Sequence, residues 1–164
     1  MAITSAICNS FKEEILQGGH CLNASGGSPA GNAIKCALYS SNTAALSKST
    51  TVWTVASTPS ADPTNTYEVT TTGSGYTSGG NTLTAIDPTL SGDSAVCDFS
   101  NESWTSATFT ARGLLLYNST AITGFTTNRS ICAINFGGDK TVTSGTFTIE
   151  FPSPAAGTAI IEIA

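Results

Sequence analysis

Short segments in which apolar and polar residues alternate recur along almost the whole chain, separated by clusters of glycine, proline, asparagine and serine. In the segment 34–39, the side chains of Ile34, Cys36 and Leu38 fall on one face of an extended backbone. No stretch between such segments could form the crossover helices that parallel strands need. The pattern therefore predicts an all-β protein: an antiparallel β-sandwich, jelly-roll or Ig-like, of eight or nine short strands.

The most apolar segment, residues 108–117, is expected to be a central strand covered on both faces. A loop is expected at 57–65, which contains two prolines, and a turn at 137–140, which begins with two glycines. The other expected strands are 51–55, 66–70, 82–86, 94–99, 131–136, 147–151 and 158–163.

One short helix is expected near the amino terminus. Ile7, Phe11 and Ile15 recur at every fourth residue, which is the spacing of one helix face, and a pair of glycines ends the pattern. Ser10 and Glu13 have the spacing of a capping box, in which each side chain bonds the backbone N–H of the other residue. The pattern predicts a helix of about two or three turns.

The chain divides after this helix into an amino-terminal arm, residues 1–22, and a single β-sandwich domain, residues 23–164. The apolar stripe of the arm has two interpretations, because it can pack on its own domain or reach a neighbouring subunit. On the second interpretation the arm is the docking element, and the expected partner-binding residues are Ile3, Ile7, Phe11 and Ile15.

Charged residues are scarce: the chain has six lysines and arginines, eleven aspartates and glutamates, and a net charge of −5. Nucleic-acid affinity requires several cations placed together, so the scattered lysines and arginines argue against DNA or RNA as a partner. The apolar runs are too short to span a bilayer, and we expect no membrane partner. The lack of a signal-peptide pattern and the five irregularly spaced cysteines indicate thiols made in a reducing cytoplasm.

Few side chains are suited to catalysis. The single histidine, His20, directly precedes Cys21, and the two could meet only in a turn, so a loop histidine is the plainer interpretation. Asp98 and Glu102 are the nearest carboxylate pair for glycoside hydrolysis. The glycine-rich stretch 73–80 lacks the helix that follows a phosphate-binding loop. We expect no enzyme activity, no cofactor and no metal site.

Large aromatic side chains offer a second kind of contact, because an outward ring can stack on a sugar or enter a partner protein. Half or more of the candidates are expected in the core or at its edge. The possible exposed aromatic contacts are Trp53, Tyr76 and Trp104.

Four segments resemble, in the same order over nearly the whole chain, a group of small structural proteins of tailed bacteriophages. They are 5–16 (SAICNSFKEEIL), 73–83 (GSGYTSGGNTL), 109–113 (FTARG) and 159–164 (AIIEIA). Members of the group are virion components, and the resemblance transfers no catalytic residues. A small acidic all-β protein of this kind is most similar to a capsid decoration or cement protein, which sits over junctions between shell subunits.

The resemblance implies a non-enzymatic virion protein, made in the cytoplasm of the bacterial host, that binds the outer surface of the head and stabilises the shell. The expected partners are the major capsid protein and copies of the chain itself, in a trimer or another symmetric oligomer. Repulsion from packaged DNA makes an acidic protein a poor inner lining, which favours the outer surface. The alternative is an adhesion or glycan-binding subunit of a tail, collar or head fibre.

Overall fold

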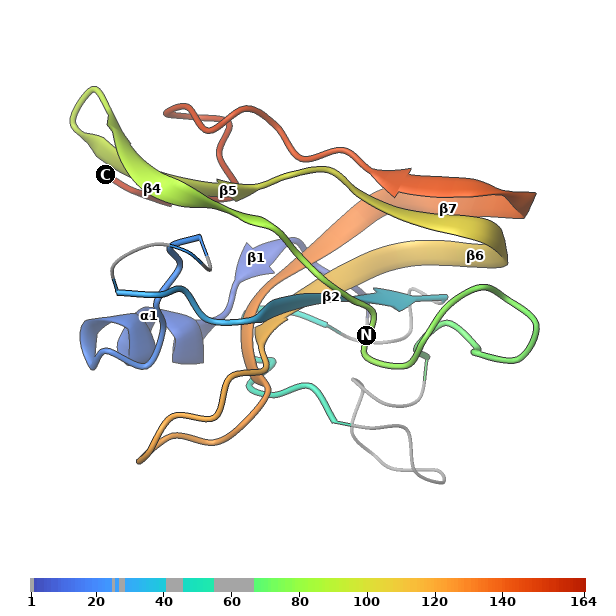
Figure 1. Ribbon diagram of the computed structural model, residues 1–164, viewed down its shortest axis with the longest axis horizontal. Coiled ribbons are helices and arrows are strands. Elements are labelled where there is room, and N and C mark those ends of the chain that lie inside the picture. Colours follow the sequence, from blue (N-terminus) through green and yellow to red (C-terminus); the bar gives the residue numbers. More distant parts are fainter. Residues whose placement is uncertain (1, 25, 27–28, 41–45, 55–66) are drawn as a thin grey trace.

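The computed structural model describes residues 2–24, 26, 29–40, 46–54 and 67–164. These residues form two antiparallel sheets and one short helix (Figure 1), which confirms the expected all-β sandwich. The elements are β1 Ala6–Ile7, α1 Asn9–Leu16, β2 Ile34–Tyr39, β3 Asn81–Thr82, β4 Ala85–Ser91, β5 Ser94–Phe99, β6 Glu102–Asn118, β7 Arg129–Ile149 and β8 Ile161–Ile163.

The larger sheet has the strand order β1-β7-β6-β2-β3, and the smaller sheet has the order β4-β5-β8. A two-residue connection joins edge strand β3 to edge strand β4, so the chain closes one side of the sandwich. The opposite side lies between edge strands β1 and β8, which belong to different sheets and are not joined in this way. We call it the open side.

Two strands are far longer than expected, because β6 has 17 residues and β7 has 21. Segments 131–136 and 147–151, expected as separate strands, fall largely within the single strand β7. The expected turn at 137–140 is instead a wide bulge: Asn135 pairs with Gly113 and Lys140 with Ala111, so residues 136–139 oppose one residue of β6. An inserted bulge bends a strand without ending its pairing, which is why the turn prediction was wrong.

Further bulges curve the β6–β7 hairpin. Ser106 and Ser144 lie at register shifts and have positive φ angles of 51° and 47°. The curvature brings Phe136 and Phe147, two residues of the same strand, to a ring-centroid distance of 6.4 Å. The hairpin is therefore concave toward the small sheet, as the broad ribbons of β6 and β7 in Figure 1 show.

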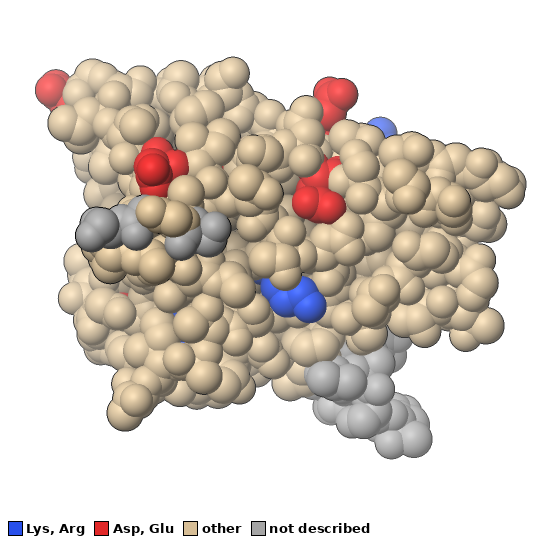
Figure 2. Space-filling view, viewed as in Figure 1, with Lys and Arg blue, Asp and Glu red and all other residues tan. Residues whose placement is uncertain are grey.

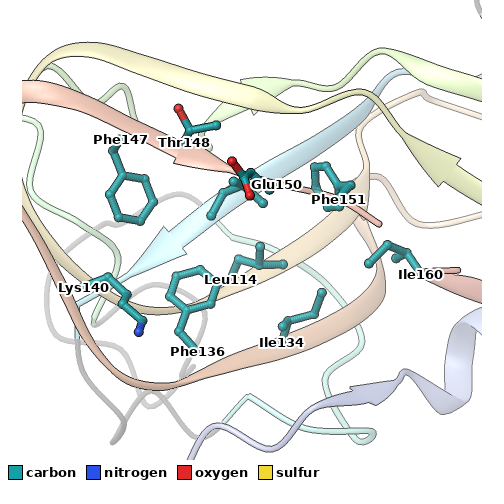
Figure 3. A pocket seen from close by; sticks show the side chains of 10 residues that line it. Leu114, Ile134, Phe136, Lys140, Phe147, Thr148, Glu150, Phe151 and Ile160 are labelled. Atoms are coloured by element: carbon teal, nitrogen blue, oxygen red, sulfur yellow. The ribbon is translucent and has the colours of Figure 1, made fainter. Parts of the chain in front are cut away.

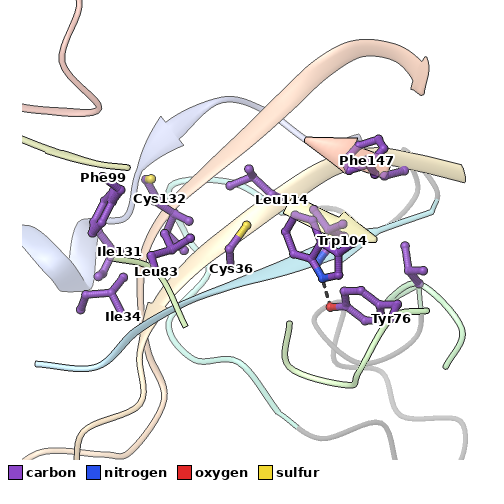
Figure 4. Packing of buried hydrophobic residues seen from close by; sticks show 14 of the residues in the cluster. Ile34, Cys36, Tyr76, Leu83, Phe99, Trp104, Leu114, Ile131, Cys132 and Phe147 are labelled. Atoms are coloured by element: carbon purple, nitrogen blue, oxygen red, sulfur yellow. Dashed lines mark hydrogen bonds between the residues drawn. The ribbon is translucent and has the colours of Figure 1, made fainter. Parts of the chain in front are cut away.

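The large sheet is covered on both faces. Ile34, Cys36 and Leu38 belong to the main core between the sheets, which Figure 4 shows together with Trp104 and Leu114. The opposite face forms a second core that Ile3, Leu46 and Trp53 cover; its remaining buried members are Ala37, Tyr39, Leu115, Tyr117 and Ala133. The expectation that the most apolar segment is a central strand covered on both faces is confirmed.

Several expected strands are shorter than the pattern suggests. Among the described residues of segments 51–55 and 66–70, Val52 bridges to Arg129, Glu68 bridges to Tyr39, and no other residue makes a bridge. Segment 82–86 divides between β3 and β4, and only the last three residues of 158–163 form β8. The loop expected at 57–65 lies outside the described residues, as do Val55 and Thr66.

The helix is present, but its start differs from the prediction. Its N-cap residue is Cys8, which makes no side-chain cap, and Ser10 lies inside the helix, so the capping box is wrong. The helix ends at the expected glycines, where the N–H groups of Gly18 and Gly19 bond the carbonyls of Ile15 and Glu14. Gly18 adopts a φ of +78°, which glycine tolerates without steric cost.

Candidate interaction surface

The apolar stripe of the arm packs on its own domain. The side chains of Ile3 and Phe11 are each only 2% exposed, while Ile7 and Ile15 are half-buried against the main core. Strand β1 also pairs with β7, which makes the arm an edge of the large sheet. Direct docking through Ile3 and Phe11 is therefore wrong for this conformation, because burial in the parent domain already removes their apolar surface from water.

A buried ionic cluster fixes the end of the helix to the sheet. The Arg129 side chain is fully buried, and its Nη2 donates to the carbonyl of Gly19 at 2.6 Å while its Nη1 donates to Thr126 O at 2.7 Å. Its Nε lies 3.5 Å from Oε2 of Glu14. The same carboxylate oxygen is 2.8 Å from Nε2 of His20. The helix, the loop that follows it and strand β7 are therefore held together by contacts with the guanidinium group of Arg129.

His20 lies in the loop that follows the helix, as predicted, and it is a buried member of this cluster. Asn118 Nδ2 lies 3.2 Å from Nδ1 of His20 and donates to Asn32 Oδ1 at 2.8 Å. An acceptor at Nδ1 and a donor at Nε2 describe the neutral imidazole. Burial lowers the pKa of His20 from its ordinary value of 6.5, against the opposing hydrogen bond to Glu14.

This burial predicts a pH effect on stability. Because the pKa of His20 is lower in the folded protein than in the unfolded chain, the unfolded chain binds the proton more readily and stability falls as pH drops below 6.5. The slope of unfolding free energy against pH between about 7 and 5.5 should be less positive in His20→Gln than in the wild type. Urea unfolding of both proteins measures it, and equal slopes would contradict the prediction. Burial raises the pKa values of Glu68 and Asp98, so these two residues change stability with pH in the opposite direction. Both proteins contain them, and the difference between the two slopes therefore reports the effect of His20.

The three aromatic candidates are buried, so the expectation of exposed contacts is wrong. Trp53 is 7% exposed, and Tyr76 and Trp104 are each 3% exposed. Trp53 stacks on Tyr117 in the second core at a centroid distance of 5.0 Å. Tyr76 and Trp104 lie 6.3 Å apart in the main core. Their rings fill space beside the large sheet and offer no stacking platform to a sugar.

Glu68, which was not among the predicted site residues, is the acceptor around which the glycine-rich stretch folds. Its carboxylate receives hydrogen bonds from the hydroxyls of Tyr76 and Ser78 and from the N–H of Gly79. Burial raises the pKa of Glu68, and these three donors oppose the rise. The N–H of Gly79 and two hydroxyls of this stretch therefore bind a carboxylate of the chain itself.

Each carboxylate considered for hydrolysis has one oxygen that is hydrogen-bonded within the fold. Asp98 is fully buried, and its Oδ1 accepts the N–H of Phe99 at 2.9 Å. Oε1 of Glu102 accepts a hydrogen bond from Asn81 at 2.8 Å. Among the described residues, no group of three or more histidine, cysteine, aspartate or glutamate side chains is placed to hold a metal ion.

All five cysteines are thiols, and only Cys21 is not buried. Burial raises the pKa of Cys8 and of Cys97 to about 12. Cys36 lies within the main core, as its alternation with Ile34 and Leu38 predicts. Thiols held so far from ionisation act as small apolar side chains.

The exposed large apolar side chains of the described residues gather at one end of the sandwich. They are Leu16, Leu90 and Ile163, with exposures of 88%, 79% and 57%. Leu90 pairs with Ala95, and Ala95 pairs with Ile163, so the three side chains form a row on one face of the small sheet. We call Leu16 and this row the apolar end.

The apolar end continues the core face of the small sheet. Cys97 and Ile161, two residues further along, point into the main core. Between sheet and helix lies a hollow of about 150 Å³ that Ile15 and Ile163 both line. The small sheet therefore extends past the part that the helix covers.

Beyond this end the surface is mostly uncharged. Figure 2 shows one face on which acidic and basic side chains are few and isolated. On the β6–β7 hairpin, hydroxyls pair across the strands, Ser103 with Thr148 and Thr110 with Thr141, each at 2.8 Å. Such a surface is well hydrated without carrying a strong field.

A second apolar hollow, of about 460 Å³, lies on the concave side of the β6–β7 hairpin. Figure 3 shows Phe136 and Phe147 at one end of it and Phe151 and Ile160 at the other. Its floor is formed by Leu114 and neighbouring apolar side chains. It is the larger of the two hollows and contains no residue of the apolar end.

The fold and these surfaces define an all-β, two-sheet protein with apolar surfaces suited to contact with other molecules. The chain matches no protein-family model, and searches of curated proteins and of solved structures returned no significant match. Among the described residues, no helix is both long and apolar enough to cross a membrane.

Proposed function

We propose that this chain is a non-enzymatic structural protein of a tailed-phage virion, a decoration or cement protein that binds the outer surface of the head. The observation that carries the proposal is the apolar end, where Leu90 and Ile163 are exposed in one row of the small sheet and Leu16 is exposed at the end of the helix, on a sparsely charged molecule. Clustered apolar surface of this kind is typical of a docking site. The partners would be the major capsid protein and further copies of the chain in a trimer or another symmetric oligomer.

The mechanism would be thermodynamic linkage. A protein that binds assembled shell but not free shell subunits stabilises the shell by its binding free energy. With a net charge of −5 and no cluster of cations in the sequence, apolar contact is the natural source of that binding energy. The engagement of Asp98 and Glu102 inside the fold supports a role without catalysis.

The docking element differs from the one the arm pattern suggests. Ile3 and Phe11 are buried, but Ile15 lines the hollow beside the apolar end and Leu16 is exposed next to it. The carboxyl-terminal turn of the helix is thus the part of the arm that remains available to a partner. For the alternative, an adhesion or glycan-binding subunit of a tail, collar or head fibre, the aromatic side chains expected to stack on a sugar are buried.

The test is a charged triple variant, Leu16→Asp with Leu90→Asp and Ile163→Asp, introduced into the phage that encodes the chain. Burying unpaired carboxylates at the interface should lower the number of copies per purified particle at least about tenfold. The matched control carries three aspartates at exposed hydroxyl positions of the β6–β7 hairpin, Thr105, Thr143 and Thr146, and should retain normal occupancy.

Quantitative mass spectrometry of purified particles gives the copy number, and electron cryomicroscopy gives the position. Thermal unfolding of the isolated variants checks that both remain folded. Normal occupancy of the folded triple variant would show that docking does not use the apolar end. A chain confined to the tail or collar would favour the adhesion alternative, and its absence from particles would exclude a virion role.

A further inference from the structure

The buried amide of Asn118 has a defined orientation. Its Oδ1 accepts the backbone N–H of Thr120 at 3.0 Å, and its Nδ2 donates to the carbonyl oxygen of Gly19 at 3.4 Å. A backbone N–H only donates a hydrogen bond, and a backbone carbonyl only accepts one. These two contacts therefore distinguish the amide oxygen from the nitrogen, and a third, from Nδ2 to Asn32 Oδ1 at 2.8 Å, agrees with them.

His20 lies against the NH2 group of this amide. Its Nδ1 is 3.2 Å from Asn118 Nδ2, so Nδ1 accepts a hydrogen bond and carries no proton. The ring proton is then on Nε2, which donates to Glu14 Oε2 at 2.8 Å. The neutral imidazole thus connects helix α1, which contains Glu14, to the last residue of β6, which is Asn118.

This arrangement has no place for a second proton on His20. A new N–H at Nδ1 would point at the NH2 group of Asn118, and two donors repel each other. Turning the amide over would give Nδ1 an acceptor. It would also place the NH2 group against the N–H of Thr120 and the amide oxygen against the carbonyl of Gly19. Protonation is therefore expected to displace the imidazole from Asn118.

The charges around the ring do not offset the added proton. Among the described residues, the charged groups that face His20 are Glu14 from α1 and Arg129 from β7. The Glu14 carboxylate already lies 3.5 Å from Nε of Arg129. A protonated His20 would therefore put two buried cations beside one carboxylate, which is costly away from water.

The small sheet faces His20 across the hollow of about 150 Å³. Among the described residues that line it, the titratable group of this sheet is Cys97, whose thiol has a pKa of about 12 and stays neutral. The other side chains that the sheet contributes are apolar: Pro88, Ala95, Val96, Ile161 and Ile163. The hollow therefore gives a displaced ring some space but offers an imidazolium no acceptor side chain.

The segment that contains His20 is joined to the sheets mainly by side chains. Within the described residues, one backbone–backbone bond links 17–22 to a segment outside the arm, from the N–H of Asn32 to Cys21 O. The remaining anchors are the bonds from Arg129 and Asn118 to Gly19 O and from Cys21 N–H to Asn32 Oδ1. A segment held in this way can open locally without unfolding the strand ladders.

We propose that His20 is a pH-sensitive latch, whose protonation releases residues 17–22 and the end of α1 from β6 and β7 while the sandwich stays folded. Leu16, the last residue of α1, would then lose its fixed position. The latch does not depend on the proposed virion role. Its consequence for that role, weaker docking of the apolar end in acid, rests on the proposed function.

The first test uses the unmodified protein. Its single histidine gives an unambiguous ring signal in NMR, and this signal should titrate below 6.5, the ordinary pKa. Hydrogen–deuterium exchange, corrected for the intrinsic effect of pH, should show residues 17–21 opening more often as pH falls below 6.5, by up to about tenfold per pH unit. Amides of β2 and β6 should keep their protection.

His20→Gln is the matched variant, because glutamine can accept from Asn118 and donate to Glu14 but does not titrate. Its residues 17–21 should lose the extra opening in acid. Three results would overturn the latch: titration of His20 at or above 6.5, opening that is independent of pH, or the same dependence in His20→Gln. Acid loss of protection throughout both sheets would also overturn it. If the variant does not fold, the measurements on the unmodified protein still decide.

Particles that carry the chain test the consequence for docking. Washing at about pH 5 should release the unmodified chain at least about tenfold more than washing at about pH 7, and should not do so for His20→Gln. Normal occupancy with no release in acid would overturn the link between latch and docking. Absence of the chain from particles at both pH values would instead contradict the proposed function, while the latch is decided on the isolated protein.

Discussion

Replacing Arg129 with methionine is expected to lower the free energy of unfolding by about 3–5 kcal/mol. The side chain is fully buried and is the donor that the carbonyls of Gly19 and Thr126 share. Methionine fills much of the space but removes the donor of Thr126 O, leaves Gly19 O with only the 3.4 Å bond from Asn118 Nδ2, and removes the cation beside Glu14. Equilibrium unfolding in urea measures the change.

The matched control is Arg112→Met. Arg112 also pairs with a carboxylate at 3.5 Å, but its partner Asp139 is 65% exposed. An exposed pair contributes about 0–1 kcal/mol, so this variant should be nearly neutral. Equal losses for the two variants would show that Arg129 acts through its size alone and would contradict the role of the buried cluster.

Gly80→Ala is expected to destabilise the protein strongly, although it adds only one methyl group. A Cβ at this position would lie 1.7 Å from the carbonyl oxygen of Cys36, and the residue has a φ of +69°. The backbone of β2 would have to move away from the glycine-rich stretch, where Asn81 pairs with Cys36. We expect a loss of about 4 kcal/mol or more, or failure to fold.

Gly92→Ala separates the steric clash from the backbone strain. Gly92 has a similar φ of +63°, but nothing lies within 4 Å of the position that its Cβ would take. The cost there is the left-handed conformation alone, about 1–2 kcal/mol. Urea unfolding of the two variants measures the difference in their free energies of unfolding. Equal destabilisation would contradict the prediction, because it would mean that the backbone removes the contact with Cys36 O at no cost in free energy.

The strand pattern was predictable where the signal is local. The alternation of Ile34, Cys36 and Leu38 predicts both β2 and the face that enters the core, because side-chain period follows from backbone geometry. Segment 94–99 corresponds to β5 for the same reason. The union of 131–136 and 147–151 into one strand was not predictable, because glycines at a bulge and glycines at a turn look alike.

The candidate site was less accessible to sequence reasoning. Arg129 bonds Gly19 across 110 residues, and no pattern within one segment announces such a contact. Burial of Trp53 depends on a segment that covers the second face of the large sheet, which alternation within a single strand does not reveal. The sequence did contain a signal for Glu68. It is a single carboxylate shortly before a glycine-rich stretch, whose backbone N–H groups and hydroxyls are natural donors to it.

The pairing of the arm has a consequence for how the chain folds during synthesis. Ala6 pairs with Ala133, and Cys8 N–H bonds Ile131 O, so β1 is joined to a strand that is made much later. During synthesis the arm cannot form this pairing until β7 has left the ribosome. Until then the side chains of Phe11 and Ile3, which are buried in the folded protein, are exposed to water. Closing so long a loop comes late and costs chain entropy, whereas the β6–β7 hairpin is local and can form early. This edge of the large sheet is therefore completed late, after the β6–β7 hairpin has formed.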